Sequence, residues 1–261
     1  MSTESDYLQL ERDGSIVTLT LSRPEKRNAY SDADTVAIGQ LLGRLRADPD
    51  VRALVITGAG TTFSSGHLRE ELSETGDHEG MRLDEYENGR RFFRSVLDFP
   101  KPIVVALNGV AIGVPLVLAL IGGDIVVAER RARFMSPHVT TGLVPAANAS
   151  VWPLYVGLLR AKRLLLLPEW ISAEEAQQLG LVTEVVDDGA SLERATEYAT
   201  RLSALPPRAL RYTKQVLNSW MHDAVNGIYE HARALEFLSM GTEEYRQAVN
   251  QLRQDQETSS P

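Results

Sequence analysis

The sequence predicts an α/β protein with a largely parallel sheet, followed by a region made only of helices. Short apolar runs that are typical of strands alternate with segments whose apolar residues recur at helical spacing, as in βα units. From about Ser191 onward, only long helical patterns remain. The length of 261 residues suits one large domain or a domain with an appendage.

The individual elements follow in order along the chain. Residues 15–24 alternate apolar and polar side chains, which predicts a strand that ends at Pro24. Residues 32–48 and 82–97 carry apolar side chains at helical spacing and are predicted helices, and the apolar run at 53–60 is typical of a strand. Later elements are strands at 103–107 and 124–128, a helix at 173–180 and a strand at 181–186.

The chain carries no charge between residues 103 and 123, a length that is sufficient to cross a bilayer. Two turn signals divide this segment. Asn108 and Gly109 form a turn dipeptide after the strand, and Pro115 is placed to open a helix that runs to about Ile121. The segment is therefore predicted to be a buried strand, turn and helix, and we expect no membrane partner.

Composition narrows the classes of function. The net charge of -8 argues against a nucleic-acid partner, because phosphates require a basic protein face. The absence of cysteine excludes disulfides, thiolate metal sites and a cysteine nucleophile. The histidines lack the spacing of metal ligands, so no metal site is expected. The N-terminal residues show no signal-peptide pattern, and we expect a soluble, cytoplasmic protein.

Four blocks of sequence occur in a recognisable order. They are LSRPEKRNAY, VITGAGTTFSSGHLREEL, KPIVVALNGVAIGVPLVLALIGGDIVVAERRARFMSPHVTTGLVPA and LPEWISAEEAQQLGLVTEVV. Through the order and spacing of these blocks, the chain resembles the enoyl-CoA hydratase/isomerase (crotonase) family over residues 17–253. The resemblance implies a crotonase-like spiral of ββα turns in residues 1–195 and a C-terminal helical trimerisation region in residues 196–261. It also implies a homotrimer or a homohexamer.

The resemblance implies that two backbone N–H groups hold a thioester oxygen while it becomes an enolate. The first donor would be the N–H of His67, which follows Gly66. The second would be the N–H of Val114, which follows Gly113. Family members usually have glycines where this chain has Val114 and Pro115. The valine side chain therefore narrows the space through which a thioester oxygen reaches the N–H, and the proline restricts the backbone conformation of Val114. The alternative interpretation is a tight turn with no role in an oxyanion hole.

The acid and base of the family are replaced in this chain. The resemblance places Val117 and His138 at the positions of the two glutamates with which family hydratases hold water and move its proton. Valine cannot move a proton, so efficient hydration of a 2-enoyl-CoA is not expected. His138 is a candidate base or acid; alternatively, it is a neutral histidine packed in an acyl pocket and bonded to a backbone carbonyl. The His67 side chain is expected to shape the pocket.

Coenzyme A is expected to bind as part of the substrate, with no other cofactor. The resemblance places Lys26 and Arg27 near its adenine and phosphates, which require positive charges or N–H groups. Gly66 and Gly113 complete the predicted binding set, and Arg253 is a weaker candidate for a phosphate contact with a neighbouring subunit. The acidic side chains that follow the first donor are interpreted as a solvated helix face: Glu70, Glu71, Asp84 and Glu85.

Three functions remain open at this point. The first is an acyl-CoA enzyme that uses the oxyanion hole with a nonstandard base. The second is a C–C bond hydrolase acting on a β-diketone without CoA, because the segment GLVPAANASVWP and His138 are similar to 6-oxocamphor hydrolase, a family member. The second histidine and the aspartate of that hydrolase fall near Pro115 and Ala147, where this chain lacks them. The third is a noncatalytic acyl-CoA binder. The intact RPEKRN block favours the first.

Overall fold

A six-stranded sheet runs through the body of the computed structural model, which describes residues 6–68 and 83–258. The strands, in their order across the sheet, are β1 (Leu8–Asp13), β2 (Ile16–Leu21), β3 (Ala53–Gly58), β5 (Ile103–Leu107), β7 (Ile125–Glu129) and β10 (Glu184–Val186). β1 pairs antiparallel with β2, and the other neighbours are parallel. The largely parallel sheet predicted from the sequence is confirmed.

A second sheet among the described residues contains β4 (Thr62–Ser64), β6 (Val110–Ile112), β8 (Arg133–Met135) and β9 (Ile171–Ser172), in that order. β4, β6 and β8 are parallel to one another. Each of them follows a strand of the first sheet along the chain: β3 leads into β4, β5 into β6 and β7 into β8. The chain therefore alternates between the two sheets as it advances, which is the spiral of ββα turns that the family resemblance implies.

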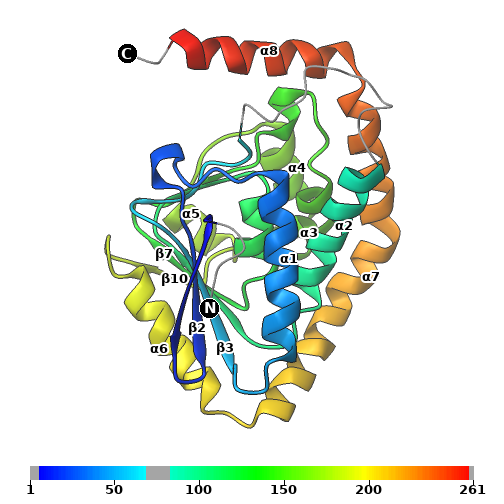
Figure 1. Cartoon of the computed structure of the whole chain (residues 1–261). Coiled ribbons are helices and arrows are strands. Elements are labelled where there is room, and N and C mark those ends of the chain that lie inside the picture. Colours follow the sequence, from blue (N-terminus) through cyan, green and yellow to red (C-terminus); the bar gives the residue numbers. More distant parts are fainter. Residues whose placement is uncertain (1–5, 69–82, 259–261) are drawn as a thin grey trace.

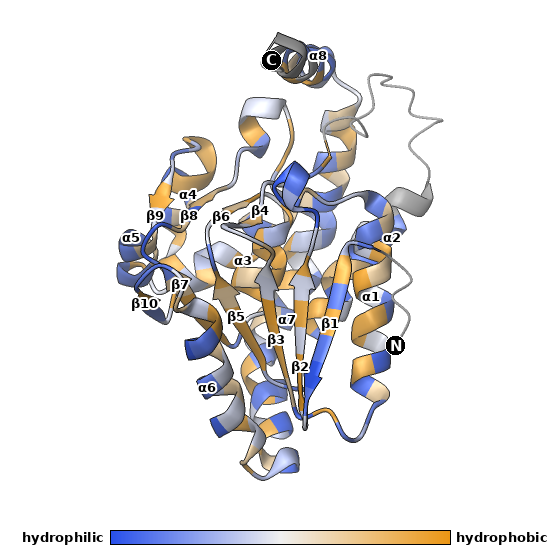
Figure 2. Cartoon of the chain, turned by 60° about the vertical axis from the view of Figure 1, so that its left-hand side comes forward, coloured by the Kyte–Doolittle hydropathy of each residue, from blue (hydrophilic) through white to orange (hydrophobic). Residues whose placement is uncertain are grey.

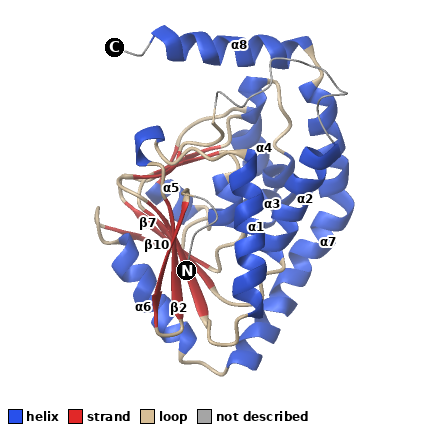
Figure 3. Cartoon of the chain, viewed as in Figure 1, coloured by secondary structure: helices blue, strands red, loops and turns tan. Residues whose placement is uncertain are grey.

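Helices cover both faces of the larger sheet (Figures 1 and 3). The helical elements are η1 (Pro24–Lys26), α1 (Asp32–Ala47), α2 (Leu83–Leu97), η3 (Val117–Ile121), η4 (His138–Thr141), α3 (Ala146–Val156), α4 (Leu158–Leu166), α5 (Ala173–Gln178), α6 (Ser191–Ser203), α7 (Pro207–Met240) and α8 (Glu243–Thr258). α6 packs on β3, β5 and β7 from one side. α1, α2, α3 and α7 form the layer on the opposite side (Figure 3).

The residues of β3 show how the core is divided between the two faces. All of β3 is buried, and its side chains alternate between two hydrophobic clusters because successive residues of a strand point to opposite faces. Val55 packs with Ala195 and Ala199 of α6, whereas Leu54 and Ile56 belong to the larger core. Figure 2 shows the contrast with β1, the mainly hydrophilic edge strand. Burial on both faces explains the continuous apolar run of β3.

The uncharged segment 103–123 forms β5, β6 and a short helix, as the turn signals predict. The helical residues begin at Pro115, and the helix closes with a hydrogen bond from the Gly122 N–H to the Val117 carbonyl at 2.9 Å. That five-residue spacing makes η3 a π-helical turn. In the described parts of the chain, no helix combines the length and the apolar composition needed to cross a bilayer.

The C-terminal region is helical from Ser191 onward, as predicted. The expected boundary at 195/196 falls within α6, which packs on the large sheet, and the division into two domains stays a prediction. α7 runs along the body beside α3, and α8 crosses one end of it (Figure 1). α8 packs against η4 with its Tyr245 and Val249 buried, so the last helix lies beside the segment that carries His138.

Candidate functional site

Three predicted site residues lie just beyond neighbouring parallel strands. His67 follows β4, Val114 follows β6 and His138 follows β8. The carboxyl ends of parallel strands emerge at the same edge of a sheet, and ligands of α/β proteins bind at such edges. The second sheet therefore brings together three segments that are far apart in sequence.

Two glycines allow the strand ends to approach each other. Gly66 has a φ of +98°, and a Cβ built there would lie 3.3 Å from the carbonyl oxygen of Ile112, the last residue of β6. Gly113 has a φ of +70°, and its N–H donates to the carbonyl of Met135 at 3.2 Å. A side chain is disfavoured at both backbone conformations. Gly66 and Gly113 thus shape the loops of both predicted donors, and a contact with CoA remains a prediction for each.

The backbone of His67 is held by Tyr30. The Tyr30 N–H donates to the Gly66 carbonyl at 3.0 Å, and the Leu68 N–H donates to the Tyr30 carbonyl at 2.8 Å. In this parallel bridge the neighbours of His67 bond to Tyr30, so the N–H of His67 itself points away from Tyr30. This orientation is compatible with the predicted donor role.

The His67 side chain is also fixed. Its Nδ1 lies 2.9 Å from the Leu68 carbonyl oxygen, and its Nε2 lies 3.2 Å from Oδ1 of Asp32. The ring packs edge-on against Tyr30, with 5.0 Å between the ring centroids. The hydrogen bond from His67 lowers the pKa of the Asp32 carboxyl. Both ring nitrogens therefore face protein oxygens, and the ring shapes the wall of the donor loop.

The turn from Gly113 to Val117 leaves one amide donor available. The N–H groups of Leu116 and Val117 donate to the carbonyls of Gly113 and Val114, at 3.0 and 2.7 Å. Pro115 has no N–H. Within the described parts of the chain, no acceptor takes a hydrogen bond from the N–H of Val114. This is the arrangement that a second oxyanion donor requires.

His138 is the first residue of η4 and is held through its ring. Its Nδ1 lies 3.0 Å from Oγ of Ser136, and Nδ2 of Asn148 donates to the same Oγ at 2.9 Å. Burial lowers the pKa of His138 to about 4, although the residue as a whole is only half-buried. The histidine is therefore neutral at pH 7, and the partner of its ring is a serine hydroxyl and not the backbone carbonyl of the alternative interpretation.

Comparison with known proteins now identifies the family. The enoyl-CoA hydratase/isomerase family model matches residues 11–248. The chain belongs to the enoyl-CoA hydratase/isomerase family. It is 33% identical over 241 residues to 1,2-epoxyphenylacetyl-CoA isomerase of Escherichia coli (strain K12), with 90% of each protein covered. It is 30% identical over 244 residues to 2,3-dehydroadipyl-CoA hydratase of the same strain, with 93% of this chain and 94% of the hydratase covered.

The fold comparison agrees with the sequence comparison. The crystal structure of an enoyl-CoA hydratase/isomerase from Mycobacterium paratuberculosis matches with a TM-score of 0.89 at 35% identity, covering 96% of this chain and 99% of that chain. The crotonase fold predicted from the sequence is thereby confirmed. The relatives include both an isomerase and a hydratase, so membership of the enoyl-CoA hydratase/isomerase family leaves the reaction of this chain to be argued from its own residues.

Val117 supplies no proton chemistry in this member of the enoyl-CoA hydratase/isomerase family. It lies in η3 and is buried among apolar side chains of the main core. Within residues 6–68 and 83–258, no group of three or more acidic, histidine or cysteine side chains is arranged to hold a metal ion. Glu70 and Glu71 lie outside the described residues, and so do the side chains of Asp84, Glu85 and Arg253.

The predicted CoA-binding turn lies against the first donor loop. Lys26 and Arg27 are exposed, and their carbonyls accept hydrogen bonds from Ser65, from its Oγ at 3.3 Å and from its N–H at 3.0 Å respectively. Ser65 immediately precedes Gly66. The two cations therefore stand beside the segment that leads to the His67 donor, and their contact with CoA stays a prediction.

Sequence reasoning missed three polar residues that build the site. Asn28 is fully buried and joins the RPEKRN turn to the loop before β4. Ser136 and Asn148 are buried beside His138. An asparagine inside a polar turn signals a left-handed backbone, which Asn28 adopts with a φ of 55°. No comparable signal exists for Ser136 and Asn148, because their role depends on a contact across twelve residues.

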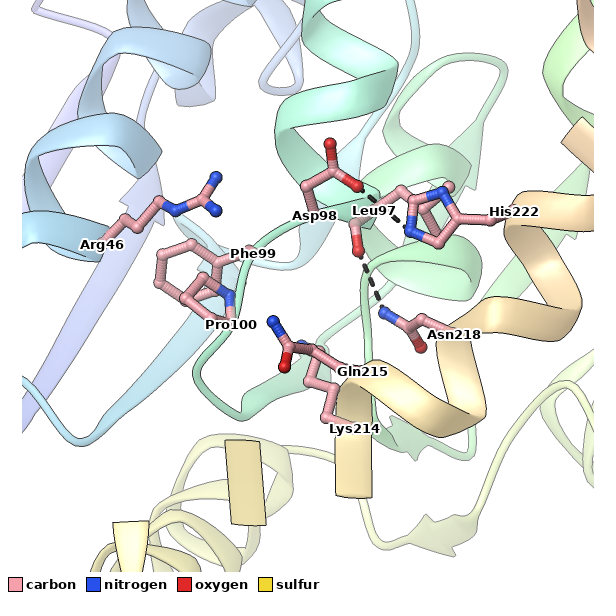
Figure 4. Close-up of a pocket in the computed structure, with 9 residues that line it drawn as sticks. All are labelled: Arg46, Leu97, Asp98, Phe99, Pro100, Lys214, Gln215, Asn218 and His222. Atoms are coloured by element: carbon pink, nitrogen blue, oxygen red, sulfur yellow. Dashed lines mark hydrogen bonds and ion pairs between the residues drawn. The ribbon is translucent and has the colours of Figure 1, made fainter. Parts of the chain in front are cut away.

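A pocket of about 210 Å³ lies at the start of β5, away from the strand ends that carry the predicted site residues. Figure 4 shows the residues that line it. It is lined by Arg46 of α1, by residues 97–100 before β5 and by one side of α7. There Nε2 of His222 lies 3.1 Å from Asp98, and Nδ2 of Asn218 donates to the Leu97 carbonyl at 2.9 Å. These contacts attach α7 to the end of α2. The pocket contains none of the predicted site residues, so we assign it no part in the chemistry.

Proposed function

We propose that this protein binds an acyl-CoA thioester and stabilises its enolate with the backbone N–H groups of His67 and Val114. The observation that carries the proposal is the Val114 amide, which lacks a protein acceptor in the described residues and stands at the same sheet edge as the His67 loop. Preorganised donors of this kind stabilise charge that develops on an oxygen, and usually form the largest single catalytic contribution.

The two-carboxylate hydration of a 2-enoyl-CoA is not part of the proposal. Val117 is apolar and buried, and a histidine with a pKa near 4 is a weak base. Relative to an ordinary imidazole with a pKa of about 6.5, the lowered basicity of His138 disfavours proton abstraction by roughly 3 kcal/mol. The arrangement instead suits a reaction in which an enolate forms without deprotonation by a carboxylate, or binding without turnover.

The positive charges of the RPEKRN turn support CoA as the carrier of the acyl group. Lys26 and Arg27 are exposed beside the donor loop, where they can meet phosphates without disturbing the core. Ser65 connects their carbonyls to the segment before Gly66. A ligand that spans from this turn to the sheet edge would place its anionic end on the cations and its thioester at the two donors.

Calorimetric titration with acetoacetyl-CoA tests the proposal. We expect binding at micromolar ligand, because its enolate carries the charge that the two donors would hold. Arg27→Ala should weaken this binding about 10-fold through loss of a charge-assisted hydrogen bond. Arg208→Ala, which removes an exposed arginine at the start of α7, is the matched control and should leave the affinity unchanged.

Each outcome of the titration has a consequence. Micromolar binding that depends on Arg27 supports the acyl-CoA site, and turnover of enoyl- and 3-oxoacyl-CoA then separates an enzyme from a noncatalytic binder. Absence of binding at millimolar ligand would contradict both, and free cyclic β-diketones would become the substrates to test, as for a C–C bond hydrolase.

We also propose that the chain forms a homo-oligomer through its exposed apolar helix faces. Trp220 of α7 is 74% exposed and Leu159 of α4 is 83% exposed, values that are unusual for such large apolar side chains. Further exposed apolar residues on the same two helices are Leu158, Leu166, Tyr212, Val216, Leu217, Ile228, Leu235 and Leu238. Association of copies would remove this surface from water.

Light scattering coupled to gel filtration tests the oligomer. We expect the mass of three or six chains for the natural protein. Trp220→Glu should shift the mass to that of one chain, because it places a charge in the apolar face. Leu192→Glu changes a residue of α6 that is 42% exposed and lies outside that face, so its mass should match the natural protein. A single-chain mass for the natural protein would contradict the proposal.

A further inference from the structure

Three side chains form a hydrogen-bonded row beside the proposed acyl site. Asn148 of α3 donates from Nδ2 to Oγ of Ser136 at 2.9 Å, and Ser136 Oγ lies 3.0 Å from Nδ1 of His138. Asn148 and Ser136 are each only 2% exposed. Water therefore does not compete for the hydrogen bonds of Ser136 and Asn148, and the proton positions must satisfy these buried side chains.

The Ser136 hydroxyl determines which group donates and which accepts in each hydrogen bond of the row. Its oxygen already accepts a hydrogen bond from Asn148, and the hydroxyl has one proton with which to donate a hydrogen bond. In the described residues, the hydrogen bonds of the Ser136 hydroxyl go to Asn148 and His138. If His138 donated from Nδ1, the buried hydroxyl proton would have no acceptor, which costs about 1–3 kcal/mol. Donation from Ser136 to Nδ1 leaves every group of the serine satisfied.

The orientation of the Asn148 amide also supports donation from the Ser136 hydroxyl to Nδ1 of His138. As placed, Oδ1 of Asn148 has no partner among the described residues. If the amide were turned over, Oδ1 would accept from Ser136, and neither N–H of the buried amide would have an acceptor among the described residues. Buried donors without a partner are rarer than buried carbonyl oxygens with unused acceptor capacity. The placed orientation is therefore the favourable one.

We propose that Asn148, acting through Ser136, holds His138 as the neutral tautomer with its proton on Nε2, so that His138 offers a bound acyl group a hydrogen-bond donor and not a base. Asn148 and Ser136 are then positioning residues. No described residue forms a hydrogen bond with Nε2, which leaves this N–H for a ligand. The matching substrate class is an acyl-CoA with an acceptor oxygen beyond the thioester, such as a 3-oxoacyl-CoA.

The ligand part of this inference rests on the proposed function, whereas the tautomer is a property of the free protein. The test is long-range ¹H–¹⁵N correlation spectroscopy of protein labelled with ¹⁵N-histidine, with the His138 signals assigned from a His138→Gln sample. At pH 7 we expect an unprotonated, pyridine-type Nδ1 and a protonated, pyrrole-type Nε2. The reverse pattern, or two protonated nitrogens, would overturn the proposal whether or not acyl-CoA binds.

Variants test whether Ser136 and Asn148 cause the preference. Ser136→Ala should mix the two tautomers, so that the two ¹⁵N shifts move toward each other. Asn148→Asp, ionised at pH 8, should accept a hydrogen bond from the serine hydroxyl, so that the histidine carries its proton on Nδ1 and donates to Ser136. Thr141→Val is the matched control, because Thr141 Oγ1 donates to the backbone carbonyl of His138 at 2.8 Å and not to its ring. Folded Ser136→Ala and Asn148→Asp proteins that both retain the natural tautomer would refute the role.

Discussion

Replacing Val114 with proline is expected to abolish enolate formation in bound acetoacetyl-CoA. Proline lacks the N–H that the proposed oxyanion hole uses as its second donor. Removal of one such donor typically lowers turnover about 100- to 1,000-fold, which corresponds to roughly 3–4 kcal/mol of lost stabilisation of the developing charge. The enolate has its own near-ultraviolet absorption band, so titration followed by absorbance measures its fraction directly.

Val114→Ala is the control for this prediction. Alanine shortens the half-buried side chain and retains the N–H, so the enolate band should persist. Thermal unfolding of both variants checks that the turn beyond β6 still folds. A folded Val114→Pro protein that keeps the natural enolate band would remove Val114 from the site and favour the alternative interpretation of a tight turn.

Replacing Asn28 with alanine is expected to lower the free energy of unfolding by about 3–5 kcal/mol, because several buried backbone groups lose their partners. Its Nδ2 donates to the carbonyls of Ala59 and Thr62, at 2.9 and 2.7 Å. Its Oδ1 accepts from the Arg23 N–H at 2.9 Å. Alanine also tolerates the left-handed φ of 55° poorly. Urea unfolding with an unchanged m-value would measure the loss.

Two further variants separate the contribution of the hydrogen bonds from that of the backbone strain. Asn28→Gly removes the same hydrogen bonds without the backbone strain, so it should be less destabilising than alanine by about 1 kcal/mol. Arg27 has a similar φ of 52°, but it is exposed. Arg27→Ala should therefore change stability by no more than about 0.5 kcal/mol. A loss below 1 kcal/mol in Asn28→Ala would show that the hydrogen bonds of Asn28 between the RPEKRN turn and the loop before β4 contribute little to stability.

The elements of the fold could largely be predicted from the sequence. The strands β2, β3, β5 and β7 and the helices α1 and α2 appear where apolar runs or periodic apolar patterns predict them. Pro115 and Gly122 mark the ends of the helical turn between β6 and β7. The strands β4, β6, β8 and β9 escaped prediction, because elements of two or three residues are too short to show a period.

The candidate site could be predicted only as separate segments. The order and spacing of the four sequence blocks pointed to His67, Val114 and His138, and they also placed Val117 at a family glutamate position. The local sequence around His138 contains no information about the neutral state of its ring. That state depends on burial and on Asn148, whose amide reaches Ser136 from a different helix.

By itself, the sequence determined the alternation of strands and helices and the family, and it predicts that Val117 and His138 stand where relatives carry two glutamates. Apolar periodicity, proline and glycine act within a few residues, so these features are visible locally. The tertiary structure alone decided which strand ends meet, which amide at that edge lacks an acceptor among the described residues, and which groups Asn28 and Asn148 bond. Hydrogen-bond partners and burial depend on residues that are distant in sequence, and the parallel arrangement of β4, β6 and β8 is what brings them together.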